Sequence, residues 1–424
     1  MPEIKLSPEL RFPGHDDDWS EVAFENLFSF KTTNSLSREK LNYEGGNIKN
    51  IHYGDIHTQF SSHFDIKKEL VPYINEDVDT SKIVDESYLK EGDLVIADAS
   101  EDYNDIGKAI EILNLNNERV VAGLHTFLAR LESDDLALGF MSFLMKTRRV
   151  RLEVMRIAQG TKVLGISYKR LAKSTLCLPQ PEEQQKITDF LTSIDKRINL
   201  LEQKRDALER YKKGVMQKLF SQEIRFKDED GNDFPFWEEK RLGKVFLSQK
   251  GKGLSKNDIV RDGQYECVLY GELYTTYPEV VNEIVSFTNI KEGTISANSD
   301  LLVPCSTTTT GIDLANVTAL NKEGVRLGGD ITILRSNDPI NNVFYAYYLS
   351  NHKKLELAKY GQGTTIVHLY YNHFKKMMID VPSKKEQDKI AEFLMTIDKT
   401  IKGLSEQIIF SQDYKKGLLQ KMFI

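Results

Sequence analysis

Cysteine is scarce in this sequence of 424 residues, which contains only three. Cys177, Cys267 and Cys305 lie far apart, and none belongs to a C-x-x-C pair. This spacing excludes a zinc ribbon and argues against a disulfide framework. We therefore expect three buried, reduced thiols.

Long hydrophobic runs are also absent. The sequence has no stretch of about 20 apolar residues that could span a bilayer. It also lacks the basic start and short apolar run of a leader peptide. Hydrophobic residues make up 40% and charged residues 28% of the chain, as is typical of soluble globular proteins. We expect a cytoplasmic protein without a membrane partner, and a chain of this length favours two domains over one core.

Motifs that carry catalysis are missing as well. The segment Gly251-Lys252-Gly253-Leu254-Ser255 fits neither a P-loop nor G-x-G-x-x-G. Asp338-Pro339-Ile340 is a turn, not the Asn-Pro-Pro-aromatic motif of amino-methylation. The eight histidines show no metal-ligand spacing, and no G-x-S-x-G elbow occurs. We expect the chain to be no enzyme and to hold no metal or cofactor of its own.

Charge is distributed unevenly along the chain. The net charge is −6, but Met141–Lys173 carries nine basic side chains against Glu153 alone. Local potential governs the binding of a polyanion more than net charge does. The segment is therefore either a polyanion-binding face or the solvated face of an exposed helix.

The sequence contains an internal repeat. A shift of 203 residues superposes Gln159-Gly160-Thr161 on Gln362-Gly363-Thr364, and Tyr211–Gly214 on Tyr414–Gly417. Between Pro181–Phe220 and Lys384–Phe423, 18 of 40 positions are identical without a gap. The segments before these stretches correspond only loosely. The sequence therefore alternates two variable segments with two similar ones.

Both similar stretches have the apolar spacing of long helices. Their apolar residues recur at three- and four-residue intervals, and neither interior contains proline. Each helix would be about 60 Å long. Because a lone helix would expose its apolar seam, we expect the two to pair antiparallel; the alternative is that each packs on its own domain. The seam residues are Ile187, Leu191, Ile194, Ile198, Leu201 and Leu208 in the first helix, and Ile390, Leu394, Ile397, Ile401, Leu404 and Ile408 in the second.

The remaining segments indicate two mixed α/β (α+β) domains. Short β-rich runs such as Asp93–Ile96, Leu301–Val303 and Asp330–Leu334 alternate with polar turns, and helical patterns appear near Leu138–Ile157 and Val343–Tyr360. Ser383 and Glu386 predict a capping box at the start of the second helix. The predicted organisation is a first domain at 1–180, a helix at 181–220, a second domain at 221–383 and a helix at 384–424.

This layout resembles the specificity subunits of Type I restriction-modification systems. The Gln-Gly-Thr loops, the strands ending at Pro179 and Pro382, the Pro181–Ile187 helix entry and the Tyr-Lys-Lys-Gly exits are all similar to that family. The resemblance covers essentially the whole chain. It implies that each α/β domain is a target recognition domain reading one half of a bipartite, asymmetric double-stranded DNA site.

The resemblance also implies partners. The paired helices would set the spacer and dock two modification (methyltransferase) subunits, with restriction (endonuclease and translocase) subunits completing the complex. S-adenosylmethionine, ATP and Mg²⁺ would then belong to those partners, which would methylate adenine and cleave DNA.

Candidate DNA-binding residues lie in polar loops and basic segments of both domains. Hydroxyl and amide groups can bond phosphates or base edges, and glycine lets backbone amides approach a phosphate. The glycines could equally serve as left-handed helix caps, and the threonine run could be an ordinary turn. In the second domain the candidates are Lys250, Lys252, Lys256, Thr307, Thr308, Thr309, Thr310, Gly311, Gln362, Gly363, Thr364 and Thr365. In the first they are Ser100, Tyr103, Asn104, Arg148, Arg149, Arg151, Arg156, Gln159, Gly160, Thr161 and Lys162.

Three other functions remain open at this point. The helices could belong to a coiled-coil interaction or scaffold protein that binds no DNA. The chain could be an enzyme with divergent motifs, which S-adenosylmethionine binding by this chain alone would reveal. It could also be an orphan or anti-restriction subunit without its own restriction system.

Overall fold

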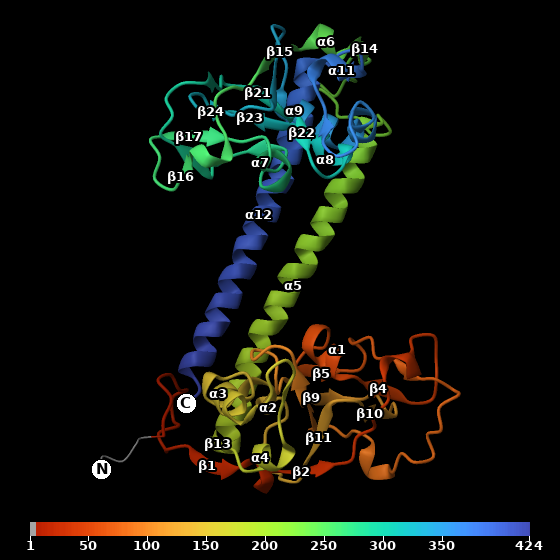
Figure 1. The fold of residues 1–424 in the computed structure, drawn as a ribbon, viewed down its shortest axis with the longest axis vertical. Coiled ribbons are helices and arrows are strands. Elements are labelled where there is room, and N and C mark those ends of the chain that lie inside the picture. The colour runs from red at the N-terminus through yellow and green to blue at the C-terminus, as the bar shows by residue number, and fades with distance from the viewer. Residues whose placement is uncertain (1–5) are drawn as a thin grey trace. The chain divides into compact units, whose positions relative to one another are not determined.

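The computed structural model describes residues 6–424, which form two compact units (Figure 1). Unit 1 contains residues up to Leu201 together with Gln407–Ile424, and unit 2 contains Glu202–Glu406. The division cuts across both long helices, so each unit holds one α/β domain and a part of each helix. The predicted fold class, two mixed α/β domains with two long helices, is confirmed.

Unit 1 is built on a five-stranded sheet of order β2-β11-β7-β9-β5, in which only the β5–β9 pair is parallel. A four-stranded sheet, β10-β4-β6-β3, lies on the same domain, and β1 pairs with β13 and β8 with β12. The strands are β1 (Ser20–Ala23), β2 (Phe28–Lys31), β3 (Leu41–Asn42), β4 (Lys49–Ile51), β5 (His63–Asp65), β6 (Tyr73–Ile74), β7 (Leu94–Ala97), β8 (Ala99–Ser100), β9 (Ala109–Asn114), β10 (Val120–Ala122), β11 (Thr126–Leu131), β12 (Leu164–Gly165) and β13 (Thr175–Leu178). The helices are α1 (Tyr53–Thr58), α2 (Phe140–Leu144), α3 (Arg148–Ile157) and α4 (Tyr168–Ala172).

Unit 2 repeats this plan with a five-stranded sheet of order β15-β25-β21-β23-β18. A second five-stranded sheet, β16-β19-β17-β24-β20, replaces the four-stranded one, and β14 pairs with β27 and β22 with β26. The strands are β14 (Glu238–Arg241), β15 (Leu247–Lys250), β16 (Ile259–Val260), β17 (Tyr265–Val268), β18 (Val280–Val281), β19 (Ser286–Thr288), β20 (Thr294–Ile295), β21 (Asp300–Pro304), β22 (Ser306–Thr307), β23 (Thr318–Leu320), β24 (Arg326–Leu327), β25 (Ile331–Arg335), β26 (Val367–His368) and β27 (Met378–Val381). The helices are α6 (Leu242–Val245), α7 (Glu272–Thr275), α8 (Gly311–Leu314), α9 (Asn342–Tyr347), α10 (Lys354–Ala358) and α11 (Tyr371–Phe374).

The central strand of each main sheet is buried on both faces. In β7, Leu94 and Ile96 belong to one core and Val95 to another, because successive side chains of a strand point to opposite faces. In β21, Leu301 and Leu302 are divided between two cores in the same way. Continuous apolar runs in these strands therefore mark sheets that are covered on both sides.

The two long helices are α5 (Pro181–Phe220) and α12 (Lys384–Lys421). The first half of α5 packs in unit 1 with the end of α12, and the rest of both helices packs in unit 2, so the helices are antiparallel (Figure 1). Every predicted seam residue is buried except Leu201, Leu208 and Ile401, which are half-buried. The second helix ends at Lys421, because Met422 and Phe423 enter the core of unit 1.

Equivalent ion pairs join the helices within each unit. Lys415 Nζ lies 2.5 Å from Asp195 Oδ1 in unit 1, and Lys212 Nζ lies 2.7 Å from Asp398 Oδ1 in unit 2. Each ammonium also lies over an aromatic ring, 5.2 Å from the centroid of Phe143 and 4.9 Å from that of Tyr347 respectively. The sequence repeat is therefore also a repeat of tertiary contacts.

A second repeated contact fixes the start of each long helix. Arg11 binds Glu183 through Nε at 2.9 Å, and Arg225 binds Glu386 through Nε at 3.0 Å. The predicted capping box is only half present, because Ser383 Oγ accepts from the Glu386 amide at 3.4 Å while the Glu386 carboxylate binds Arg225. In a capping box, the Glu386 carboxylate would accept from the backbone amide of Ser383. Here it accepts from the guanidinium of Arg225 instead.

Both predicted domain helices are broken into shorter pieces. The pattern near Leu138–Ile157 divides into α2 and α3, and the pattern near Val343–Tyr360 divides into α9, a π-helical turn at Tyr348–His352, and α10. The apolar periodicity continued across these breaks and so did not reveal them. All three cysteines are free and buried, as expected.

Candidate nucleic-acid interface

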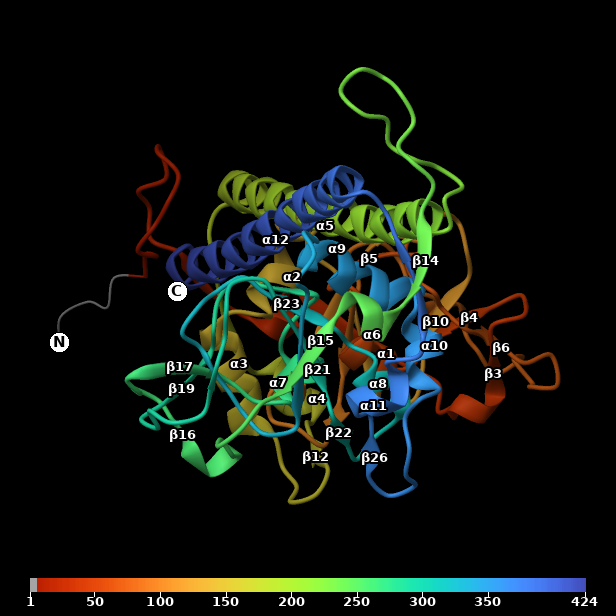
Figure 2. The same cartoon turned by 90° about the horizontal axis from the view of Figure 1, so that it is seen from above.

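The threonine loop and the Gln-Gly-Thr loop of unit 2 lie side by side. Strand β22 pairs with β26, with Ser306 opposite His368 and Thr307 opposite Val367. Gln362 and His368 exchange two backbone hydrogen bonds, which close the Gln-Gly-Thr segment into a hairpin. The pairing therefore creates one polar surface from residues 307–311 and 362–365, which are about 55 residues apart in sequence. Seen from above, β26 lies on the side of unit 2 away from α12 (Figure 2).

The hydroxyl groups of the threonine run have different roles. Thr307 is buried, so its role as a DNA contact stays a prediction that its burial does not favour. Thr309 and Thr310 donate to Asp313 at 2.6 and 2.8 Å and cap α8, which holds the pKa of that carboxyl below its usual range. Thr308 is exposed and makes no side-chain hydrogen bond within the described chain.

A lysine and two aromatic side chains extend this surface. Lys250 Nζ lies 5.2 Å from the centroid of the Tyr370 ring and 3.6 Å from Asp330 Oδ1. Tyr370 stacks on His368, which contacts Ser306 Oγ at 3.0 Å. Sequence analysis missed His368 and Tyr370, although their position directly after the Gln-Gly-Thr loop was a usable signal.

Lys252 and Lys256 lie on a different loop. Lys256 begins a short 3-10 turn (Lys256–Asp258) capped by Ser255 and Asp258, and both lysines are exposed. No contact joins them to the threonine or Gln-Gly-Thr loops among residues 6–424.

Unit 1 carries the equivalent pair of loops. Strand β8 pairs with β12, with Ser100 opposite Leu164, and Gln159 exchanges two backbone hydrogen bonds with Gly165. Tyr103, Asn104, Gln159, Thr161 and Lys162 are exposed on this surface. Ser100 is buried and its hydroxyl accepts from the Asp102 amide at 3.0 Å, so its role as a DNA contact stays a prediction that its burial does not favour.

Both loop glycines are required by the backbone. Gly160 has φ of +128° and Gly363 has φ of +119°, in the region that residues with a Cβ rarely adopt. A Cβ at either position would lie 2.0 Å from a carbonyl oxygen, that of Val163 or Ile366. The hairpin itself, rather than a helix cap, requires these glycines.

The arginines of α3 do not form one free basic face. Arg149 binds Glu21 at 2.7 Å and Arg156 binds Glu153 at 2.7 Å. Arg151 is half-buried and donates to the carbonyl oxygens of residues 103, 104 and 106, the last at 2.7 Å. Among the arginines of α3, only Arg148 is exposed and makes no ion pair within the described residues. The basic residues of this segment therefore do not form one continuous basic patch on the surface.

Neither a cluster of metal ligands nor a membrane-spanning helix is found within the part of the chain that the structure describes. No group of three or more His, Cys, Asp or Glu side chains within residues 6–424 could hold a metal ion. Over the same residues no helix is both long and apolar enough to cross a bilayer. The surfaces that remain are polar loops carrying amides, hydroxyls and lysines, which is the chemistry of nucleic-acid contact.

The fold and surfaces together define a class: a duplicated binding protein in which two α/β units share a pair of long helices. A family model described as "Type I restriction modification DNA specificity domain" matches residues 16–210 and 236–409. The chain belongs to this family. Its role is recognition of a DNA target within a Type I restriction-modification system, and the scaffold and orphan alternatives are not favoured.

Relatives agree with this assignment. The chain is 25% identical over 307 residues to a putative Type I restriction enzyme MjaX specificity subunit of Methanocaldococcus jannaschii, covering 70% of this chain and 69% of the relative. It is 29% identical over 212 residues to the Type I restriction enzyme MjaVIII specificity subunit of the same organism, covering 49% of this chain and 47% of the relative. The fold is similar to that of the Type I restriction-modification system S subunit from M. genitalium, with a TM-score of 0.59, 15% identity and 99% of each chain covered.

Proposed function

We propose that each unit reads one half of a bipartite, asymmetric double-stranded DNA target through its paired loops. The observation that carries this proposal is the recurrence of one scaffold, a glycine hairpin beside a polar loop, with different side chains in the two units. Thr308 and Thr365 are exposed in unit 2, whereas Tyr103, Asn104 and Lys162 are exposed in unit 1. Different side chains at equivalent positions present different hydrogen-bonding groups to base edges, so the two half-sites differ.

The lysines of these loops bind phosphates and fix the register of each unit on DNA. Phosphate contacts position a protein but do not read sequence. Lys162 and Lys250 stand beside the glycine hairpins, while Lys252 and Lys256 would reach the backbone from their separate loop. The helices α5 and α12 set the number of unread base pairs between the two half-sites.

The exposed faces of the helices bind two modification subunits, and restriction subunits complete the complex. Apolar side chains that no core covers support this docking: Ile409 is 58%, Phe410 73% and Tyr414 50% exposed in unit 1. Exposed apolar groups gathered on one helix mark an interaction surface. The chain catalyses nothing itself, and S-adenosylmethionine, ATP and Mg²⁺ are bound by the partners.

Methylation mapping tests the recognition role. The chain is produced with the modification subunit encoded beside it, and adenine methylation is mapped across the host DNA. We expect one bipartite motif that disappears when this chain is deleted. An active modification subunit in a stable complex that yields no motif would overturn the proposal.

Variants in single loops test the assignment of the halves. Thr308→Val and Thr364→Val in unit 2 should alter one half of the motif, and Asn104→Ala in unit 1 the other. Thr32→Val, at an exposed position outside the paired loops and the long helices, is the control and should alter neither. A change in both halves from a single-loop variant would contradict the division between units.

A further inference from the structure

A cavity of about 550 Å³ lies in unit 1, and Asn104 of the polar loop forms part of its edge. It is enclosed by α1 and the turn after it, by the start of β9, and by α3 with the segment before it. A volume of this size is within the range of small-molecule sites, about 300–1,000 Å³. No step of the proposed DNA recognition uses it.

Three cationic side chains face this cavity: Lys108, Lys146 and Arg151. Lys108 lies 2.6 Å from Asp105, but no carboxylate lies within ion-pair distance of Lys146 or Arg151 among the described residues. Two positive charges are therefore left without a partner on one wall. Lys146 is exposed and Arg151 is half-buried, so both charges are open to a negatively charged ligand.

The position of Arg151 is fixed by its own contacts. Its Nη2 donates to the carbonyl oxygens of Tyr103, Asn104 and Ile106. Its Nη1 is buried and has no acceptor within the described chain, and the Nδ1 atom of His57 is likewise buried without a partner. The guanidinium is therefore held in one position on the cavity wall, and its planar donor geometry suits a phosphate or carboxylate oxygen.

Apolar side chains line the rest of the cavity. Phe60, Ile110, Met145 and Met155 lie on its wall, with the polar groups of Gln59 and Asn104 at its edge. An inorganic ion would leave this apolar surface unused, whereas a flat ring would cover it.

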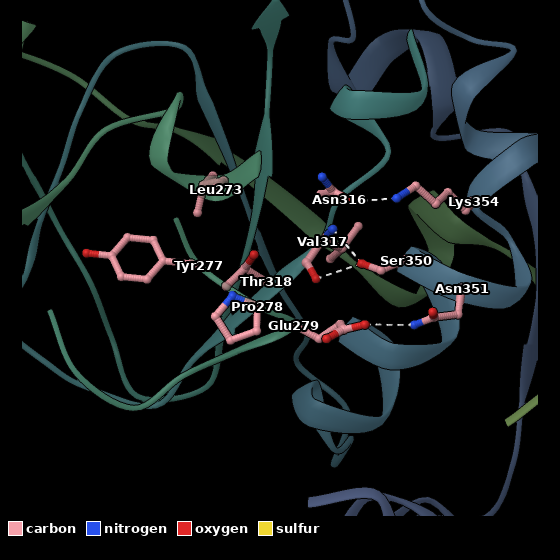
Figure 3. A pocket seen from close by; sticks show the side chains of 10 residues that line it. All are labelled: Leu273, Tyr277, Pro278, Glu279, Asn316, Val317, Thr318, Ser350, Asn351 and Lys354. Atoms are coloured by element: carbon pink, nitrogen blue, oxygen red, sulfur yellow. Dashed lines mark hydrogen bonds between the residues drawn. The ribbon is translucent and has the colours of Figure 1, made fainter. Parts of the chain in front are cut away.

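The equivalent place in unit 2 is closed by internal hydrogen bonds. There a cavity of about 190 Å³ is lined by Asn316, Ser350 and Lys354, among others (Figure 3). Lys354 donates to Asn316 at 2.8 Å, and Ser350 both accepts from and donates to the backbone of Val317, at 2.7 and 2.9 Å. The duplicated fold thus provides two pockets, of which one satisfies its own polar groups and the other does not.

From this contrast we infer that the unit 1 cavity binds a small organic phosphate with a planar ring, of the nucleotide class. Lys146 and Arg151 bind the phosphate, and the ring lies against Met145, Met155 and Phe60. This ligand site shares only Asn104 with the loops assigned to DNA. The inference does not depend on the proposed function.

The affinity for phosphate depends on pH through Lys146. Desolvation at the cavity wall and the nearby Lys415 and Lys108 lower the pKa of this ammonium to about 8, while Asp195 acts in the opposite direction. Lys108, Arg151, Asp105 and His57 are the other charged or titratable groups at the cavity. Because an anion binds the protonated lysine, binding weakens as pH rises from 7 to 9.

Calorimetric titration of the full chain with AMP, ATP and pyrophosphate tests the inference. We expect binding of AMP or ATP that Lys146→Met weakens by about tenfold or more, through loss of one charge-assisted contact. Lys354→Met, in the closed pocket of unit 2, is the matched control and should leave the affinity unchanged. Arg151→Lys is a second variant, which keeps the positive charge but loses the planar donor geometry of the guanidinium group.

Several outcomes would overturn the inference. Absence of binding by all three probes at millimolar concentration would do so, as would binding that Lys146→Met leaves intact. Pyrophosphate binding as tight as AMP binding would remove the ring from the proposal. Displacement of AMP by a short DNA duplex would show that the cavity belongs to the DNA surface, whereas failed DNA recognition with intact AMP binding would count only against the proposed function.

Discussion

Gly363 shows how much one backbone position matters to a recognition loop. Alanine at this site would bring its Cβ to 2.0 Å from the Ile366 carbonyl oxygen, at a φ of +119°. The hairpin would have to open, which removes Thr364 and Thr365 from their place beside the threonine loop.

We therefore expect Gly363→Ala to weaken DNA binding by about tenfold or more while the core of unit 2 stays folded. Gly417→Ala is the control, because a Cβ there meets nothing within 4 Å and replaces a helical glycine. That variant should be neutral or more stable by about 0.5–1 kcal/mol. DNA affinity by fluorescence anisotropy and thermal unfolding separate the two effects; normal DNA binding by Gly363→Ala would refute the role of the hairpin.

Glu111 is a buried carboxyl whose environment opposes its charge. Its side chain is 2% exposed and accepts from the amides of Gly139 and Ser142 at 2.6 and 2.7 Å, yet burial raises its pKa to about 7. Because the folded state holds this proton more tightly than the unfolded state, stability falls as pH rises from about 4.5 to 7.

We expect the free energy of unfolding of Glu111→Gln to be less dependent on pH than that of the parent, by about 3 kcal/mol between pH 4.5 and 8. Urea denaturation of both proteins at several pH values measures the difference. Parallel pH profiles would show that the folded and unfolded pKa values of Glu111 are equal.

At the residue scale, the sequence predicted the positions of the loops, but it did not predict which of their side chains are accessible to a ligand. Gln159, Gln362 and their glycines could be found because the repeat aligned them. The burial of Ser100 and Thr307 could not be, because it depends on the pairing of β8 with β12 and of β22 with β26, strands of two residues each. A strand of two residues is too short to show the alternating apolar pattern by which a strand is recognised in a sequence.

At the scale of the element, the long helices were the most predictable part of the fold. A three- and four-residue apolar spacing over 40 positions fixes both the length and the buried face. The ion pairs between the helices could not be predicted, because they depend on the register of one helix against the other. The small sheet β10-β4-β6-β3 was equally unpredictable, since its strands are short and lie between polar turns.

Reversal of charge tests the helix register. Lys415→Asp places a second carboxylate against Asp195 and should destabilise unit 1 by about 1–3 kcal/mol, because both groups are more than half-buried. Asp195→Lys combined with Lys415→Asp should recover part of this loss. Chemical denaturation of the four proteins gives the coupling energy, and strict additivity of the two changes would exclude a direct contact.

At the scale of the whole molecule, the two units depend on segments distant in sequence. Leu418, Met422 and Phe423 belong to the core of unit 1, and Met216, Leu219 and Phe220 belong to that of unit 2. Each α/β domain is thus completed by the last turns of the helix that began in the other unit.

Deletion of residues 418–424 should therefore destabilise unit 1 and leave unit 2 unaffected. Loss of three buried apolar side chains costs several kcal/mol, about 2–5 for each large one. Hydrogen exchange read by mass spectrometry should show faster exchange in β1 and β13 and unchanged exchange in β21 and β25. Equal destabilisation of both units would mean that they unfold as one.

The same dependence imposes an order on synthesis at the ribosome. All the strands of unit 1 have left the exit tunnel long before Met422 and Phe423 are made, whereas unit 2 has every residue it needs once Glu406 is translated. The earlier half of the nascent chain must therefore keep an unfilled apolar site open for more than 200 residues of elongation. The unit translated first is therefore the one completed last, because it receives residues 407–424 only after all of unit 2 has been translated.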